Sequence, residues 1–283
     1  METHVGDSKH FPWHRRARSR VGRHIAQATQ KIFTSLPALE QGFGTPTITT
    51  LQWKHEALAG HRAVHLTDLH LDRYLPRHAA LVSSVAALSP DWIFITGDLL
   101  NVPSGLPHLF RFLGELRELA PIYLTLGNHD HYSGVPVDKF ALQADRHKIQ
   151  LLLNQTTFVP LRKGELGIVG LDDPSIHKAD VSCIPKLRRP NRFTLLLAHA
   201  PNVLDLLTPD HPIDFVLCGH SHGGQWDVPG LTSWWLPYGC AGRQAGHHTK
   251  HGHRLYVNRG VGWSLLPWRI NCPPEIVLME WVD

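Results

Sequence analysis

Short apolar runs, each ending in a polar cluster, recur along the chain from residue 62 onward. The first three runs comprise residues 63–67, 92–96 and 122–126. Their length and composition are typical of buried strands. The clusters that follow them begin at Asp68, Asp98 and Asn128, at intervals of 30 residues, which is about the length of one strand–helix–strand unit. The pattern predicts alternating strands and helices, as in an α/β fold.

Apolar residues at helical spacing fill the intervals between these strands. The buried stripe of one predicted helix comprises Leu81, Val82, Val85 and Leu88, and that of the next comprises Leu109, Phe112, Leu113, Leu116 and Leu119. Later apolar runs predict strands at residues 167–171, 194–198, 214–218 and 275–281. The repeating part of the sequence therefore predicts one α/β body, which we place at residues 56–283.

The first 55 residues differ in pattern and predict a separate accessory region. Between residues 15 and 36 apolar side chains fall on one helical face, and the stretch holds six Lys or Arg and no acidic residue. It predicts a basic amphipathic helix, which either packs on the body or lies in an anionic membrane surface. Residues 42–50, rich in Gly, Thr and Pro, are interpreted as a linker.

Charge is unevenly distributed, and this narrows the class of partner. Residues 1–36 hold seven Lys or Arg and two acidic residues, whereas the rest of the chain holds 21 and 22. A nearly neutral body argues against a nucleic-acid groove across it, so no nucleic-acid partner is expected. The four cysteines are far apart and no run is long and apolar enough for a membrane span. We expect a cytoplasmic protein, either soluble or peripheral on the inner face of the membrane.

Polar clusters follow five of the predicted strands and contain side chains of the types that bind metals. They supply Asp68 and His70, Asp98, Asn128, His199, and His220 with His222. Because ligands of open α/β sheets bind at the carboxyl ends of the strands, we expect these side chains to lie together. Oxygen and imidazole donors suit first-row divalent metals. A single cluster is as readily a solvated loop with a helix cap, but five of them favour a metal site.

In order, these motifs are D-x-H, G-D, G-N-H-D, a lone H and G-H-x-H, and they resemble the calcineurin-like metallophosphoesterase family over roughly residues 62–283. The resemblance implies a sandwich of two β-sheets flanked by helices, with two divalent metal ions at one edge. It implies that one metal is bound by Asp68, His70, Asp98 and His222, and that Asp98 bridges to a second metal completed by Asn128, His199 and His220. Manganese is the expected metal, with zinc or iron as alternatives.

The implied activity is metal-dependent hydrolysis of a phosphoric ester or pyrophosphate, because two cations can hold a hydroxide for attack and clamp the phosphoryl oxygens. The leaving oxygen also needs a proton, and His129 is the candidate donor; its alternative role is to support the metal ligands. Many members of the resembling family have an aspartate three residues after the bridging one, paired with this histidine, where this chain has Asn101. An amide orients an imidazole but does not stabilise its charged form as a carboxylate does. The departure weakens the implied acid role of His129 more than the metal assignments.

Residues 127–134, 219–225 and 256–262 are similar to one bacterial branch of that family, which includes membrane-associated phosphodiesterases and a UDP-2,3-diacylglucosamine pyrophosphohydrolase of lipid A synthesis. The similarity implies cleavage of a diester or pyrophosphate in a phosphorylated small molecule or a lipid-linked substrate. The late tryptophans either receive acyl chains or pack in the core; they are Trp226, Trp234, Trp235, Trp263 and Trp268. Two alternatives stay open: a soluble phosphodiesterase for nucleotides or other small diesters, and a non-catalytic metal-binding scaffold. The sequence leaves the oligomeric state open.

Overall fold

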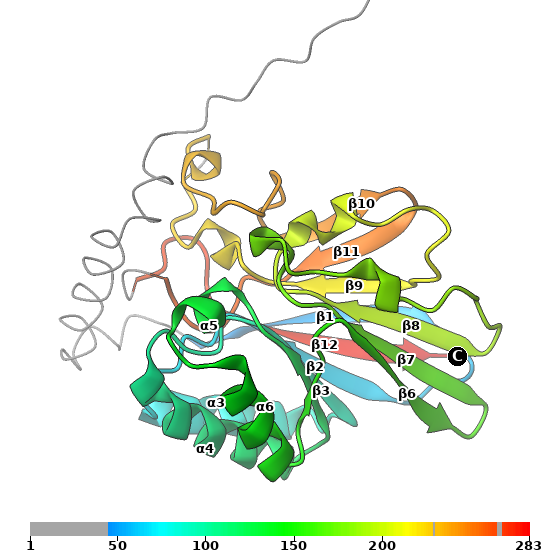
Figure 1. Ribbon diagram of the computed structural model, residues 1–283, viewed down its shortest axis with the longest axis horizontal. Coiled ribbons are helices and arrows are strands. Elements are labelled where there is room, and N and C mark those ends of the chain that lie inside the picture. Colours follow the sequence, from blue (N-terminus) through cyan, green and yellow to red (C-terminus); the bar gives the residue numbers. More distant parts are fainter. Residues whose placement is uncertain (1–44, 229, 265–267) are drawn as a thin grey trace, which may run out of the picture.

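Two six-stranded β-sheets form the centre of the molecule (Figure 1). The computed structural model describes residues 45–228, 230–264 and 268–283. The first sheet contains, in spatial order, β1 (Thr47–Lys54), β12 (Glu275–Val282), β2 (Arg62–Leu66), β3 (Trp92–Thr96), β4 (Ile122–Thr125) and β5 (Gln150–Leu151). The second contains β10 (Gly246–Lys250), β11 (His253–Val257), β9 (Phe215–Cys218), β8 (Arg192–Leu197), β7 (Gly164–Gly170) and β6 (Gln155–Leu161).

Both sheets mix parallel and antiparallel pairs. In the first, β2, β3, β4 and β5 run parallel to one another, whereas β12 is antiparallel to β2. In the second, β7, β8, β9 and β11 are parallel, and β6 and β10 are antiparallel edge strands. The parallel strands of each sheet therefore place their carboxyl ends, and the loops that follow them, along the same edge.

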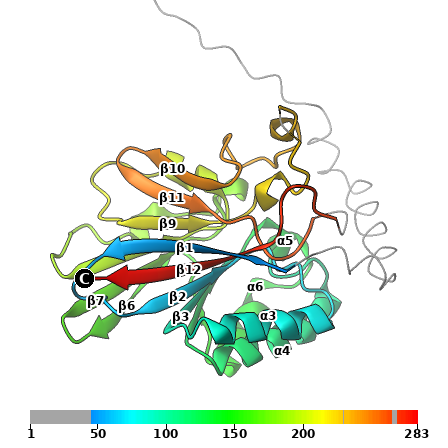
Figure 2. The ribbon, with the colours of Figure 1, turned by 180° about the vertical axis from the view of Figure 1, so that it is seen from behind.

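Helices cover the outer face of the first sheet (Figure 2). They are α3 (Pro76–Ala87), α4 (Leu106–Arg117) and α6 (Val137–Arg146), and α3 and α4 connect the parallel strands β2, β3 and β4. The predicted stripe of α4 is buried from Leu109 to Leu116, but Leu119 is 36% exposed. The prediction for Leu119 is wrong because α4 ends at Arg117, which removes the helical spacing on which the prediction depended.

Three apolar cores fill the layers. One lies between the first sheet and the helices, and a second lies between the two sheets, where Trp53, Phe94 and Trp281 meet Phe193 and Phe215. The third covers the outer side of the second sheet, where short 3₁₀ turns take the place of helices; two of these are η4 (Val181–Cys183) and η5 (Pro201–Asp205). The predicted two-sheet sandwich flanked by helices is confirmed in this described part of the chain.

The strand β1 changes the boundary predicted between the accessory region and the body. It pairs in parallel with β12 along its full length, from Thr47 to Lys54, so the linker interpretation of residues 42–50 is wrong from Thr47 onward. The segment alternates, and it buries Leu51 and Trp53 while Ile48 is 48% exposed. This period of two is the signal that the neighbouring Gly and Pro obscured.

The edge strands β5, β6 and β10 were also not predicted, and neither was β11, which lies between β10 and β9. The three edge strands are short or half-exposed, so their sequences lack a buried apolar run, whereas β11 is mostly buried but only five residues long. The helix predicted for residues 15–36 lies outside the described residues. Within the ranges that the structure describes, no helix has the length and apolar character needed to cross a membrane.

Candidate metal centre

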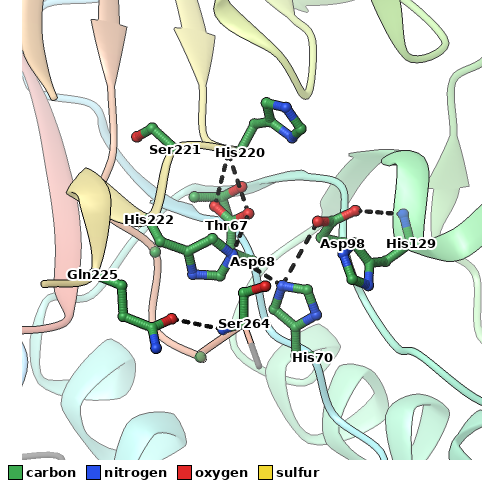
Figure 3. Close-up of polar contacts among 12 residues, drawn as sticks. Thr67, Asp68, His70, Asp98, His129, His220, Ser221, His222, Gln225 and Ser264 are labelled. Atoms are coloured by element: carbon green, nitrogen blue, oxygen red, sulfur yellow. Dashed lines mark hydrogen bonds and ion pairs between the residues drawn. The ribbon is translucent and has the colours of Figure 1, made fainter. Parts of the chain in front are cut away.

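The loops at one edge of the two sheets bring six of the predicted metal ligands together, and Figure 3 labels five of them: Asp68, His70, Asp98, His220 and His222. Asp68 and His70 follow β2, Asp98 follows β3, Asn128 begins the short helix α5 (Asn128–Tyr132) after β4, His199 follows β8, and His220 and His222 follow β9. The first sheet thus supplies both carboxylates and the amide, whereas the second supplies three of the four imidazoles. The site depends on both sheets being packed in place.

Two buried groups of candidate ligand atoms share Asp98. Within each group, one oxygen or nitrogen atom of every residue lies within 4.8 Å of the others. The first group is Asp68, His70, Asp98 and His222, and the second is Asp98, His199 and His220. All six residues are buried. This is the arrangement of donors that two neighbouring divalent ions require.

Hydrogen bonds on the outer side of three imidazoles leave a lone pair on the inner side. The Nδ1 atom of His199 donates to the carbonyl of Thr96 at 2.8 Å, and Nε2 of His220 donates to the carbonyl of Tyr238 at 2.7 Å. The Nδ1 atom of His70 meets Asn101 Oδ1 at 2.8 Å. A ring nitrogen that donates outward leaves the other nitrogen free to bind a metal.

The inner nitrogens face one another at distances that need a cation or a proton between them. His70 Nε2 lies 3.1 Å from His222 Nε2, and His199 Nε2 lies 2.9 Å from His220 Nδ1. In His70, His199 and His220 the outer ring nitrogen carries the hydrogen, so the lone pairs of His199 and His220 repel each other unless a metal ion or an added proton lies between them. The outer nitrogen of His222, Nδ1, has no hydrogen-bond partner among the described residues, so His222 can instead donate from Nε2 to His70. Asn128 adds a further atom able to bind a metal, since its buried Oδ1 has no hydrogen-bond partner among the described residues. The donor set therefore fits two metal ions.

The charges of the two carboxylates differ. Burial raises the pKa of Asp68 to about 7. Burial acts in the same direction on Asp98, but the neighbouring imidazoles of His199, His129 and His70 outweigh it and hold the pKa of Asp98 well below its usual range. The backbone N–H of His129 also donates to Asp98 Oδ1 at 2.8 Å. Asp98 is therefore a fixed negative charge at the point that both ligand groups share.

Most of the imidazoles are neutral at neutral pH, as metal ligands must be. Burial lowers the pKa of His70 to about 3 and that of His220 to about 4, and it lowers the pKa of His222 well below the usual value. His199 differs: burial opposes its charged form, but the carboxylate of Asp98, 3.3 Å away, raises its pKa well above the usual value. A cation bound beside Asp98 would replace the proton of His199.

The backbone of the site is held in a conformation that L-residues seldom adopt. Five candidate ligands have positive φ: Asp68 (53°), His70 (43°), Asp98 (51°), His220 (70°) and His222 (51°). Such strain is found where the surrounding structure imposes it, commonly at functional sites. Glycine is required nearby, because a Cβ on Gly127 would lie 2.4 Å from Asp98 Oδ1 and one on Gly219 would lie 2.3 Å from Asp68 Oδ2.

His129 lies beside the ligand groups, at the start of α5. Its Nδ1 is 2.8 Å from Asn101 Oδ1, so Asn101 contacts the predicted acid as the sequence analysis expected of that position. Behind Asn101 lies Asp72, whose Oδ2 accepts a hydrogen bond from the Asn101 side chain at 3.0 Å. Asp72 follows the D-x-H motif by two positions, but no pattern in the sequence marks it as a functional residue.

A cavity of about 210 Å³ opens onto this centre. The metal lining of the cavity consists of Asp98, Asn128, His129, His220 and His222. Its aromatic lining consists of Trp226, Trp235, Pro237 and Tyr238. The indole N–H groups of Trp226 and Trp235 donate to the carbonyls of Trp268 and Gly224, so these rings offer the cavity apolar surface. Gln225 and Ser264 add polar groups between the two linings.

Several polar residues near the site have roles that the sequence left open. Asp130, the last residue of the G-N-H-D motif, accepts hydrogen bonds from the backbone amides of Leu99, Leu100 and Gly127, and so ties the loop after β3 to the loop after β4. Asp173 accepts from Ser175 at the start of a 3₁₀ turn. Asp172 contacts His131 at 2.6 Å, and neither Asp172 nor Asp173 lines the described cavity.

The late tryptophans divide between core and surface. Trp263 is 4% exposed and packs under the guanidinium of Arg77, 3.7 Å from its ring centre. Trp234 and Trp268 are 69% and 45% exposed, whereas Trp226 and Trp235 are half-buried in the aromatic lining. The core interpretation therefore holds for Trp263 alone among the five.

This chain is similar in sequence to several known proteins. Phosphodiesterase YaeI of Escherichia coli is 32% identical over 230 residues, covering 78% of this chain and 82% of that protein. The uncharacterized metallophosphoesterase YkuE of Bacillus subtilis is 31% identical, with 77% and 78% covered. The UDP-2,3-diacylglucosamine pyrophosphatase LpxG of Chlamydia muridarum is 27% identical over 299 residues, with 82% and 88% covered.

The sequence profile of the calcineurin-like phosphoesterases matches residues 61–224, which is more than half of the chain and includes every candidate ligand. The match agrees with the buried Asp and His groups at the edge of the two sheets. This protein belongs to the calcineurin-like phosphoesterase family and is a metal-dependent phosphoesterase.

Proposed function

We propose that this protein hydrolyses a phosphodiester or pyrophosphate bond with two divalent metal ions, one held by Asp68, His70, Asp98 and His222 and the other by Asp98, Asn128, His199 and His220. The observation that carries the proposal is the carboxylate of Asp98, which belongs to both ligand groups and has Oδ2 3.6 Å from His70 Nε2 and 3.3 Å from His199 Nε2. A shared carboxylate offsets part of the repulsion between two cations. Manganese is the metal we propose, since carboxylate and amide oxygens suit it; the imidazoles also suit zinc and iron.

The two ions, when bound, supply Lewis acidity at the phosphoryl oxygens and lower the pKa of a coordinated water. The residues of this chain then have separate tasks. The backbone amide of His129 holds Asp98 in place at 2.8 Å, and the amides of Asn101 and Val102 hold Asp72. His129 directs Nδ1 toward Asn101, so a proton for the leaving oxygen would be carried on Nε2.

We propose further that the group attached to the phosphate is apolar or planar. The aromatic lining contains two indoles whose polar atoms are already hydrogen-bonded, together with Pro237 and Tyr238. Such a surface favours hydrocarbon or a flat ring and offers a sugar few hydrogen bonds. The names of two relatives, a phosphodiesterase and a UDP-2,3-diacylglucosamine pyrophosphatase, include both a diester and an acylated, nucleotide-linked substrate.

A lipid-linked substrate is the form of this proposal that we favour, with the protein cytoplasmic and peripheral at the inner face of the membrane. Exposed apolar side chains gather on the segments that carry the aromatic lining; they are Leu231, Trp234, Tyr238, Trp268 and Ile270. A β-bridge between Trp226 and Ile270 joins the segment that carries the aromatic lining to the segment that contains Trp268 and Ile270. The basic stretch predicted at residues 15–36 would add attraction to anionic headgroups.

A soluble phosphodiesterase for nucleotides is the second candidate, because the same rings can stack on a base. A panel assayed with added Mn²⁺ separates the candidates: bis(p-nitrophenyl) phosphate, a dinucleotide, UDP-glucosamine, and UDP-2,3-diacylglucosamine in vesicles. We expect the acylated nucleotide to give the highest kcat/KM. A higher value for the dinucleotide would instead identify the soluble enzyme. No Mn²⁺-dependent turnover of any member would refute the diester and pyrophosphate proposal.

The membrane part of the proposal needs its own test in the full-length chain. Ile25→Asp with Phe33→Asp places charge on the predicted apolar face and should reduce binding to vesicles that contain anionic lipid. Hydrolysis of the vesicle-borne substrate should fall with it, while hydrolysis of bis(p-nitrophenyl) phosphate should not change. Unaltered activity on vesicles would contradict a role for residues 15–36 at the membrane.

A further inference from the structure

One side-chain oxygen contacts both the predicted acid and a predicted metal ligand. Asn101 Oδ1 lies 2.8 Å from His70 Nδ1 and 2.8 Å from His129 Nδ1. An amide oxygen can only accept, so both rings must carry hydrogen on Nδ1. The lone pair of each ring is therefore on Nε2. For His70 this nitrogen belongs to the first ligand group, 3.1 Å from His222 Nε2.

The carboxylate of Asp72 determines which end of the Asn101 amide faces the histidines. Asn101 Nδ2 donates to Asp72 Oδ2 at 3.0 Å, while Asp72 Oδ1 accepts from the backbone amides of Asn101 at 2.8 Å and Val102 at 3.2 Å. A carboxylate only accepts, so the amide nitrogen must face it and the amide oxygen must face the rings. Gly105 packs closely against Asp72, because a Cβ on Gly105 would lie 3.1 Å from Asp72 Oδ1.

We propose that Asp72 is a positioning residue that sets the tautomers of His70 and His129 through Asn101. The proposal depends on the proposed function only for the tasks of the two histidines, because the hydrogen-bond chain itself is given by the donor and acceptor atoms. The chain runs from a carboxylate through an amide to two imidazoles, and each member has one orientation that satisfies its neighbours. An aspartate at position 101 would place a negative charge directly on the two rings. Here the negative charge belongs to Asp72, which is one side chain further away.

Removing the charge of Asp72 should reverse the direction of the hydrogen bonds between Asn101 and the two histidines. In Asp72→Asn the new amide keeps its oxygen on the two backbone amides and turns its NH₂ toward Asn101. Two NH₂ groups then face each other, and the amide of Asn101 relieves the conflict by turning over. Its NH₂ would then donate to Nδ1 of both rings, which moves their hydrogens to Nε2. That is the wrong tautomer for His70 as an Nε2 ligand.

Exchanging the two residues, so that Asn occupies position 72 and Asp occupies position 101, gives the variant to compare with Asp72→Asn. Asn101→Asp alone places a second carboxylate against Asp72 with no donor between them, so the two charges repel. The double variant Asp72→Asn with Asn101→Asp restores a donor–acceptor pair and leaves a carboxylate oxygen to accept from both rings. The two single changes should therefore each be harmful, and the double change should recover most of the loss. The exposed Asp210→Asn serves as the charge control.

Histidine ¹⁵N spectra of the full-length protein loaded with Zn²⁺ measure the tautomers without relying on turnover, with His70→Gln and His129→Gln to assign the signals. We expect hydrogen on Nδ1 of His129 in the wild type, the control and the double variant, and on Nε2 in Asp72→Asn. The kcat for an alkyl diester with Mn²⁺ should fall roughly 10- to 100-fold in each single variant.

The positioning role would be overturned if His129 kept its wild-type tautomer in Asp72→Asn. It would also be overturned if the fall in kcat of the double variant equalled the product of the two single falls. Should Asp72→Asn fail to fold, the comparison between Asn101→Asp and the double variant still decides, because only the proposed chain makes the second change restorative. Absence of metal-dependent turnover in the wild type would count against the proposed function, whereas the spectra would still decide the role of Asp72.

Discussion

The two linings of the catalytic cavity are built in different ways. Three residues of the metal lining, Asp98, His220 and His222, are buried, and Asn128 and His129 are half-buried. Hydrogen bonds hold the outer nitrogens of His220 and of the further candidate ligand His199. The aromatic lining is half-buried or exposed, with Tyr238 at 55%. Five candidate ligands have positive φ at the ends of strands, whereas the aromatic lining lies in turns and loops between residues 224 and 238.

The difference separates the chemistry from the choice of substrate. Strained strand ends give a metal ligand one position, which phosphoryl transfer needs, and loops allow a binding surface to differ while the strands stay fixed. The two linings meet at one hydrogen bond, from His220 Nε2 to the carbonyl of Tyr238 at 2.7 Å. Changes to aromatic side chains should therefore alter substrate affinity first and the metals only when the backbone near Tyr238 moves.

The largest effect should come from the residue that both ligand groups share. Asp98→Asn removes a negative charge from between two cations, so we expect at least one metal to be lost. The rate should fall by more than the roughly 10- to 100-fold that changes behind metal ligands cause. Metal analysis together with turnover of bis(p-nitrophenyl) phosphate checks this. Two bound ions and normal turnover would show that the metal lining is not binuclear in the way we propose.

A change at His129 should separate proton transfer from metal binding within the same lining. His129→Ala should keep both metals and lower kcat roughly 100-fold for an alkoxide leaving group. Nitrophenolate needs little protonation, so its release should be affected much less. Equal losses for both leaving groups would mean that His129 supports the metal ligands instead of donating a proton.

The aromatic lining should respond in KM and leave the metals in place. Trp235→Ala removes a ring from the cavity and should raise KM for an apolar substrate about ten-fold, which is the order expected for one buried aromatic contact. Its neighbour Trp234 is 69% exposed and does not line the cavity, so Trp234→Ala is the matched control on soluble substrates. Metal content should match the wild type in both variants; equal KM values for the two would contradict the assignment of the aromatic lining.

The sequence placed the candidate metal ligands at neighbouring strand ends because each cluster follows a buried apolar run. Strands β3 and β12 begin at the predicted residues, and the seven predicted ligands lie at one edge, although their binding of metal stays a prediction. Periodicity identifies the strand, and the strand end determines the neighbourhood of the side chain. The same logic explains the missed β1, whose alternation lies beside Gly and Pro residues that suggested a linker.

The sequence could not predict contacts that depend on side-chain geometry across loops. Asp72 and Asn101 are 29 positions apart, and only the packed structure places an amide between a carboxylate and two imidazoles. Composition indicated that the late tryptophans were unusual, but not that Trp235 lines the cavity while Trp263 is in the interior. Loops lack a regular period, so their side chains have no direction that a pattern can give.

The smallest effect concerns the layer directly behind the metal lining. His65 Nε2 lies 2.8 Å from Thr96 Oγ1, and the carbonyl of the same Thr96 accepts from His199. Burial lowers the pKa of His65 from 6.5 to about 3. Between these values the unfolded chain binds a proton that the folded chain does not, so stability must fall as pH decreases from 6.5 toward 3.

His65→Gln removes this titration while it keeps a side chain able to hydrogen-bond. Relative to wild type, it should reduce the loss of unfolding free energy between pH 6.5 and 4.5 by about 2 kcal/mol, since each pH unit in this window is worth about 1.4 kcal/mol for one proton. Denaturant unfolding with a chelator present at every pH measures the difference without a contribution from metal release. The exposed His108→Gln is the control and should leave the slope unchanged. If His65→Gln and His108→Gln give the same pH slope, the buried imidazole behind the metal lining does not contribute to acid sensitivity.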